Sequence, residues 1–101
     1  MNRGRGSAIV HEMGCSVDEF SRTLPAAMRD WRTSGGPHRW QVVTADGSPV
    51  ESIRIEPLSD RRMGALSLPV LAVTLKPADP GSDLSTEFMR RFERGFHRGG
   101  G

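Results

Sequence analysis

The turn sequence Ala45-Asp46-Gly47-Ser48 lies between two alternating stretches, and this arrangement restricts the fold of the chain more than any other feature. Before the turn, the even positions 40, 42 and 44 hold Trp, Val and Thr, and the odd positions 41, 43 and 45 hold Gln, Val and Ala. This two-residue alternation is typical of a strand that buries one face. Asp-Gly between two such runs favours a hairpin with a type I′ turn, because that turn needs positive φ at both central residues. We therefore predict a two-residue loop at Asp46-Gly47.

The predicted loop also fixes how the two strands pair. It places Val43 opposite Val50, and the later pairs follow, with Val42 opposite Glu51 and Trp40 opposite Ile53. The face predicted to be buried carries Trp40, Val42, Ile53 and Ile55. The other face carries Gln41, Val43, Val50, Ser52, Arg54 and Glu56, a mixture that suits water or a loosely held partner. One layer of helices would therefore cover this sheet.

A third strand is predicted in the apolar stretch 63–75, after a polar connection at 58–62. The alternation changes phase at Pro69, because leucines stand at positions 66 and 68 before it and apolar residues at 71, 73 and 75 after it. A β-bulge at Pro69 would return both groups to one face, and proline has no amide hydrogen to lose there. We predict a bent strand at the edge of the sheet.

The segments on either side of the sheet carry helix signals. Ser16-Val17-Asp18-Glu19 has the spacing of a capping box, and the apolar residues that follow it at helical spacing are Phe20, Leu24, Ala27, Met28 and Trp31. Glycine and proline at 34–37 end this helix. A second helix is predicted to begin between Ser82 and Ser85, with Leu84, Phe88, Phe92 and Phe96 on its apolar side.

These elements predict an α+β fold. It has two layers: a three- to four-stranded antiparallel sheet with two helices on one face, in the order (β)-α-β-β-β-α, where the bracketed strand is residues 8–13. The chain is long enough for one modest core. We expect a disordered leader at 1–7, a single α+β domain at 8–98 and a flexible tail at 99–101.

Composition limits the setting in which the protein works. A single cysteine forms no internal disulfide, which fits a reducing compartment. No apolar run is long enough to cross a membrane, and no signal-peptide pattern is present, so we predict a cytoplasmic protein without membrane contact. The net charge is only +2, and arginine supplies nearly all of the positive charge. That bacterial-like, high-GC composition explains the arginines as readily as phosphate binding does.

Catalysis has little support in the sequence. There is no phosphate-binding glycine loop and no acid/base pair, and the acidic residues at 51, 56 and 60 are expected to be solvated. We therefore expect no cofactor and do not favour an enzyme. Cys15 is the candidate reactive thiol, because it precedes a helix N-terminus whose amide dipoles stabilise a thiolate. The simpler interpretation is that Cys15 packs on Phe20.

Two further patterns bear on metal binding and nucleic-acid binding. His11, Glu12 and Cys15 are too few donors for a structural zinc site, so no metal is expected. The C-terminal helix carries an arginine stripe that could contact phosphates, formed by Arg90, Arg91, Arg94 and Arg98. The alternative is an ordinary amphipathic helix whose arginines are solvated or paired with Glu87 and Glu93.

The order α-β-β-β-α over residues 16 to 98, with Gly36-Pro37-His38 before the first strand, resembles the double-stranded-RNA-binding domain. The resemblance implies RNA phosphates held by a Lys-rich cluster at the start of the last helix. Residues 82–87 stand at that place here and contain no lysine and two acids. The resemblance is therefore one of topology, and RNA binding is not carried over.

Three functions follow from these observations. The first is a small non-catalytic interaction domain that binds a protein partner or itself through the uncovered sheet face or an edge strand. The partner-binding residues would be Gln41, Val43, Val50, Ser52 and Arg54. The second is a nucleic-acid-binding module that uses the arginine stripe, and the third is thiol chemistry at Cys15.

Overall fold

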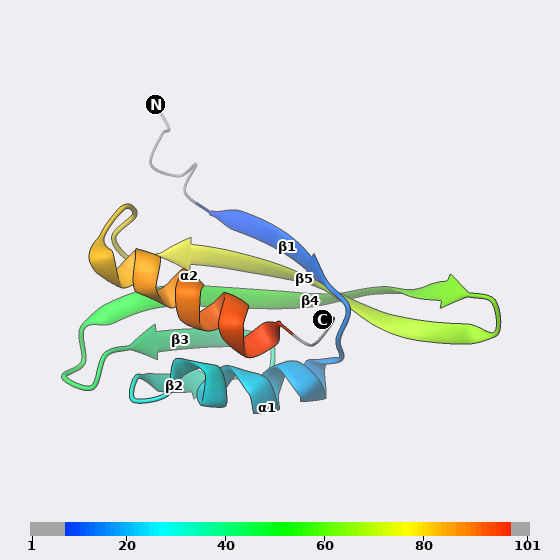
Figure 1. The fold of residues 1–101 in the computed structure, drawn as a ribbon, viewed down its shortest axis with the longest axis horizontal. Helices are drawn as coiled ribbons and strands as arrows, with labels where there is room; N and C mark the ends of the chain where they lie inside the picture. The colour runs from blue at the N-terminus through cyan, green and yellow to red at the C-terminus, as the bar shows by residue number, and fades with distance from the viewer. Residues whose placement is uncertain (1–7, 98–101) are drawn as a thin grey trace.

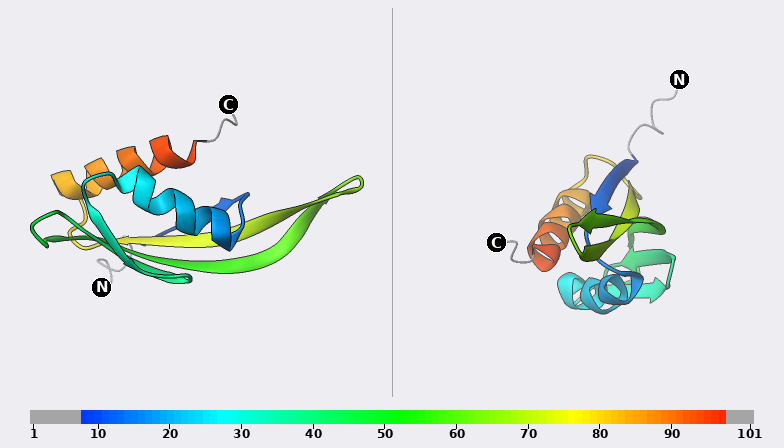
Figure 2. Two further views of the ribbon diagram at one scale, coloured as in Figure 1. Left: turned by 90° about the horizontal axis from the view of Figure 1, so that it is seen from below. Right: turned by 90° about the vertical axis from the view of Figure 1, so that its right-hand side faces the viewer.

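A computed structural model describes residues 8–97 as a two-layer α+β domain. Five antiparallel strands form one sheet, and two helices lie side by side on one of its faces (Figure 1, Figure 2). In chain order the elements are β1 (Ile9–Met13), α1 (Val17–Met28), β2 (Arg32–Gly35), β3 (Arg39–Val43), β4 (Pro49–Met63), β5 (Leu66–Pro77) and α2 (Asp83–Phe96). The strand order is β1-β5-β4-β3-β2. The leader predicted at 1–7 and the tail at 99–101 lie outside the described residues.

The fold class is confirmed, but the predicted strand number and element order are wrong. The strand at the N-terminus exists as β1, and β2 lies where the sequence predicted only a helix end and a connection. β2 pairs with β3 from Arg32 opposite Val43 to Gly35 opposite Trp40. Its sequence, Arg-Thr-Ser-Gly, has no apolar alternation, so only its pairing makes it a strand. The order β-α-β-β-β-β-α also differs from the α-β-β-β-α of the double-stranded-RNA-binding domain.

The hairpin between β3 and β4 has a longer loop than predicted. The amide of Gly47 donates to the carbonyl of Thr44, and the amide of Thr44 donates to Ser48, so three residues form the loop. Gly47 has φ +93°, whereas Asp46 is not among the described residues with positive φ, which rules out a type I′ turn. The side chain of Asp46 instead accepts hydrogen bonds from Thr44 and Ser48.

A bulge between Val42 and Val43 compensates for the longer loop. Val43 is opposite Pro49 rather than Val50, but beyond the bulge Val42 is opposite Glu51 and Trp40 is opposite Ile53, as predicted. The extra loop residue shifts the pairing by one position, and the bulge shifts it back. The predicted register is therefore correct along most of the hairpin although the predicted turn is wrong.

The segment predicted as a polar connection is instead the far half of β4. β4 continues to Met63, turns through Gly64 and Ala65, and returns as β5 (Figure 1). The bulge predicted at Pro69 lies in the facing strand, where Leu58 pairs with Val70 and Arg61 pairs with Leu68. Because the extra residue is in β4, the alternation of β5 is unbroken. The leucines at 66 and 68 therefore lie on the face opposite to Leu71.

The core lies between the helices and the inner face of the sheet. Its buried members are Phe20, Leu24, Ala27, Met28, Trp31, Val42, Val50, Ile53, Ile55, Leu71, Val73, Leu75, Phe88 and Phe92. The predicted capping box is present, since Ser16 accepts from the amide of Glu19 at 3.1 Å and the amide of Ser16 donates to Glu19 at 3.0 Å. Ser82 caps α2 by accepting from Ser85 at 3.1 Å. Both predicted helix starts are thus confirmed.

Candidate binding surface on the open face of the sheet

The sheet face opposite to the helices is uncovered by the described part of the chain (Figure 2). Side chains alternate along each strand, so the neighbours of the buried residues point to this open face. Strand pairing arranges them in rows across the sheet. The rows are Ser34, Gln41, Ser52 and Lys76, then Arg39, Arg54, Thr74 and Val10, then Glu56, Ala72 and Glu12, and then Leu58 and Val70.

The first two rows form a shallow hollow of about 500 Å³, which we call the basic hollow. Its lining residues are Ala8, Arg39, Trp40, Gln41, Ser52, Ile53, Arg54, Thr74 and Lys76. The hydroxyl of Ser52 donates to the side-chain oxygen of Gln41 at 3.2 Å. Three of the lining side chains are cationic, and no acidic residue of the described chain is among them.

The arm is the second feature of this face, and we define it as residues 58–68. β1 ends opposite Leu71 and β3 begins opposite Arg54, so the two strands of the arm pair only with each other. The arm projects beyond both helices (Figure 2). Its exposed apolar side chains are Leu58 (37 %), Met63 (56 %), Leu66 (62 %) and Leu68 (40 %).

These four side chains share one face of the arm. Leu58 pairs with Val70, and after the bulge Met63 pairs with Leu66, so the extra residue of β4 keeps the apolar positions in phase. The same face carries Arg61, which lies 3.7 Å from Glu12 in an exposed ion pair. Such an exposed pair contributes about 0 to 1 kcal/mol, so it does not fix the arm firmly.

The structure separates the predicted partner-binding residues. Gln41, Ser52 and Arg54 lie together in the basic hollow, as the predicted register required. Val43 is half-buried at the end of β3. Val50 is only 1 % exposed and belongs to the core, so its place on the outer face was wrong. The bulge leaves Val50 as the extra residue of β4, and its side chain turns inward beside that of Glu51.

Glu51 is the one buried charged residue in the described chain, and the expectation that it is solvated was also wrong. It is 3 % exposed, and its Oε1 is buried without a hydrogen-bond partner among residues 8–97. Burial raises the pKa of its carboxyl to about 7. The predicted pairing with Val42 already placed Glu51 on the inner face, so the burial of Glu51 could have been predicted from the register. Glu51 faces the core rather than a cleft, which gives it no access to a substrate.

The arginine stripe of α2 is partly used within the fold. Arg91 donates to Glu87 at 2.9 Å and to the carbonyl of Met28 at 2.6 Å, and its guanidinium lies 4.0 Å from the ring centre of Trp31. Arg90 donates to Glu87 at 2.8 Å. Arg94 is exposed, and Arg98 lies outside the described residues. Two of the four arginines are therefore held by a shared carboxylate, which lowers the positive charge available to a phosphate.

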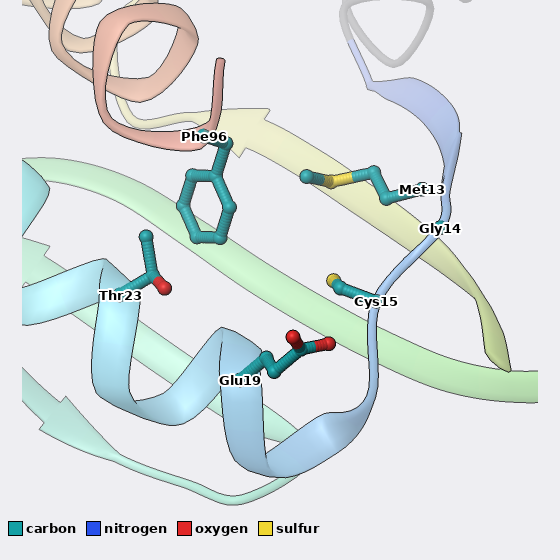
Figure 3. Close-up of a pocket in the computed structure, with 6 residues that line it drawn as sticks. All are labelled: Met13, Gly14, Cys15, Glu19, Thr23 and Phe96. Atoms are coloured by element: carbon teal, nitrogen blue, oxygen red, sulfur yellow. The ribbon is translucent and has the colours of Figure 1, made fainter. Parts of the chain in front are cut away.

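Cys15 lies next to a small hollow of about 70 Å³ between β1, α1 and the end of α2 (Figure 3). Met13, Glu19, Thr23 and Phe96 surround it. The thiol is half-buried and packs against the core cluster, as the simpler interpretation expected. Glu19 already accepts a hydrogen bond from Ser16 in the capping box. The described lining contains no histidine that could act as a base.

Residues 8–97 hold neither a cluster of metal-binding side chains nor a membrane-spanning helix. No group of three or more His, Cys, Asp or Glu side chains lies close enough together there to hold a metal ion. His11 is half-buried and packs beside Phe92, with 6.3 Å between ring centres. Neither of the two described helices has the length and hydrophobicity needed to cross a lipid bilayer.

Known proteins do not add a functional assignment. The chain matches no protein-family model and no curated protein. Function is therefore inferred from the two features of the open face, the basic hollow and the arm. The sequence indicated the first through the pairing of Gln41, Ser52 and Arg54, but it did not indicate the arm. The one feature of the sequence that could have revealed the arm is the leucine pair at 66 and 68, which stands at even positions whereas the core residues at 71, 73 and 75 stand at odd ones.

Proposed function

We propose that the protein is a non-catalytic interaction domain that associates with a second copy of itself through the apolar face of the arm. The observation that carries this proposal is the exposure of Leu58, Met63, Leu66 and Leu68 on one face of a hairpin that its own helices do not cover. A contiguous exposed apolar surface on a projecting element is typical of an association site. Full burial of such a side chain contributes roughly 1.5 to 3 kcal/mol, and these side chains are 37 to 62 % exposed, so covering each contributes roughly half of that.

The edge of the arm is unsuited to pairing with a strand of a second copy, which leaves its apolar face as the contact surface. Pro57 lacks an amide hydrogen, and the bulge and two arginines follow it along the outer edge of β4. Proline, bulges and charged side chains are the features that prevent strand pairing at a sheet edge. Two arms would therefore meet through their apolar faces.

Charge supports a second copy as the occupant. Glu12 and Glu56 lie in one row near the base of the arm, and Arg61 lies nearer its tip on the same face. In an antiparallel, two-fold arrangement the tip of each arm lies over the base of the other. Arg61 of each copy would then approach Glu56 of the other, while the leucines between them are covered.

Sedimentation velocity over a wide range of protein concentration tests this proposal. The wild-type protein should shift from monomer to dimer, and a Leu66→Ser/Leu68→Ser variant should weaken dimerisation by at least about tenfold. Val10→Ser is the matched control, because Val10 is an apolar residue of the open face, 64 % exposed, outside the arm.

A charge exchange identifies the orientation of the two arms. Arg61→Glu should weaken the dimer, and adding Glu56→Arg to it should restore part of the affinity. A wild-type protein that stays monomeric at every concentration would contradict the proposal. Equal weakening by Val10→Ser and by the leucine variant would place the contact elsewhere on the open face.

A further inference from the structure

We propose that the basic hollow binds a small anion with two or more negative charges, of the phosphate or phosphomonoester class. The proposal does not depend on self-association through the arm. It begins with the strand pairing, which sets Arg39 of β3 directly opposite Arg54 of β4. Lys76 of β5 is opposite Ser52, so its side chain is the diagonal neighbour of Arg54 on the same face.

This arrangement brings like charges together without compensation. Like charges directly opposite each other on neighbouring strands are destabilising. None of Arg39, Arg54 and Lys76 forms an ion pair with any residue in the described range 8–97, whereas Arg61, Arg90 and Arg91 do. Glu56 follows Arg54 on the same face but does not line the hollow. An anion bound between the three cations would remove their repulsion.

Neutral hydrogen-bonding groups complete the site. Ser52, Thr74 and Gln41 lie between the cationic side chains in the two rows of the hollow. The hydrogen bond between Ser52 and Gln41 orients the amide of Gln41 within the row. All these residues stand on β3, β4 and β5, the three central strands, so the backbone that positions them is held by pairing on both sides.

The dimensions and the lining identify the class of ligand. A volume of about 500 Å³ suits a small molecule. Trp40 lines the hollow from β3, but its side chain packs against the core on the inner face. The hollow therefore offers charge and hydroxyl groups rather than an aromatic slot. Guanidinium groups match the geometry of phosphate oxygens, and two of them with one ammonium suit a compact, multiply charged phosphate.

Titration calorimetry with inorganic pyrophosphate at low ionic strength tests the site. Wild-type protein should bind pyrophosphate more tightly than inorganic phosphate, and affinity should fall as salt is raised. Arg39→Gln and Arg54→Gln should each weaken pyrophosphate binding by about tenfold or more, since a hydrogen bond to a charged group is worth about 1.5 to 3 kcal/mol. Arg22→Gln, which removes the same charge from the exposed side of α1, is the matched control.

An NMR titration of the wild-type protein locates the ligand without any variant. Pyrophosphate should shift the amide signals of Gln41, Ser52 and Thr74 and leave those of the arm unchanged. No binding at low ionic strength, or equal loss in Arg22→Gln and Arg54→Gln, would overturn the proposal. Tighter binding of a short oligonucleotide, with shifts that extend to α2, would overturn it in favour of a nucleic-acid surface.

Discussion

The two faces of β4 and β5 differ sharply in what covers them. On the inner face Ile53, Ile55, Val73 and Leu75 are at most 3 % exposed beneath the two helices. One position away along the chain, Arg54, Thr74 and Lys76 point to the uncovered face and line a hollow. The apolar side chains of the inner face are covered within the chain, whereas the outer face presents cations that form no ion pair within residues 8–97 and, on the arm, exposed leucines. Stability is therefore expected to depend on the first face and association on the second.

The largest effect should come from truncating the inner face. Ile53→Ala removes a side chain that is 3 % exposed, and such substitutions reduce the free energy of unfolding by about 2 to 5 kcal/mol. Ser52→Ala, at the adjacent position on the outer face, should change it by less than about 0.5 kcal/mol. Urea denaturation of both variants measures the contrast. Similar losses for the two would mean that the outer face is also covered.

Glu51 is expected to make stability depend on pH. Burial raises the pKa of its carboxyl from the ordinary value of 4.5 to about 7 in the folded protein. The folded state therefore keeps a proton that the unfolded state releases between these pH values, so stability falls as pH rises from about 4.5 to 7. The loss amounts to at most about 3.5 kcal/mol, because one unit of pKa corresponds to about 1.4 kcal/mol.

Glu51→Gln tests this dependence by removing the ionisable group from the inner face. The variant should lose the fall in stability over that pH range and become more stable than the wild type above pH 7. Glu56→Gln is the matched control on the outer face of β4, and it should keep the wild-type pH profile. A flat profile for the wild-type protein would mean that Glu51 is hydrated in solution.

The contact between the two helices predicts a smaller loss. Gly95 of α2 lies against Ala27 of α1, and a Cβ added at Gly95 would overlap the Cβ of Ala27. Gly95→Ala should therefore destabilise the domain by about 1 to 3 kcal/mol, although alanine is the better helix former. Adding Ala27→Gly should recover part of the loss. Thermal unfolding of the two variants measures both effects, and a stabilised Gly95→Ala protein would show that the helices lie further apart.

The smallest effect is expected on the outer face. Arg39→Gln removes one of two like charges that face each other across β3 and β4. Without added anions it should stabilise the domain by about 0.2 to 1 kcal/mol, the usual size of a cross-strand pair effect. The gain should shrink as salt is raised, because salt screens exposed charges. A destabilised variant at low salt would show that Arg39 has a favourable partner.

Local signals in the sequence predicted local structure well. Ser16 and Glu19 define one helix start, and Ser82 lies at the predicted start of the other, because a cap depends only on residues within one turn. The predicted pairing of Trp40 with Ile53 was also correct, although the two-residue loop from which it was derived is not present. A three-residue loop and a bulge, neither of them visible in the alternation, cancel each other's shift.

The sequence did not predict the elements that form only by pairing with another strand. β2 has no apolar pattern and is a strand only because β3 lies beside it. The first part of the arm, residues 58–62, was predicted as a polar connection because Asp60, Arg61 and Arg62 interrupt its apolar residues. Its leucines looked like core residues displaced by a bulge at Pro69, whereas the bulge lies in β4 and leaves them outside. Exposed leucines outside the core interrupt the alternation of core residues, so alternation alone does not show which leucines are buried.

Isotope-filtered NMR on a dimer of labelled and unlabelled chains tests most directly whether the uncovered face is where copies meet. We predict contacts between chains from the methyl groups of Leu66 and Leu68 to those of Leu58 and Met63, with none to the helices. Contacts between chains that involve α1 or α2, or that leave the arm methyl groups out, would contradict this account.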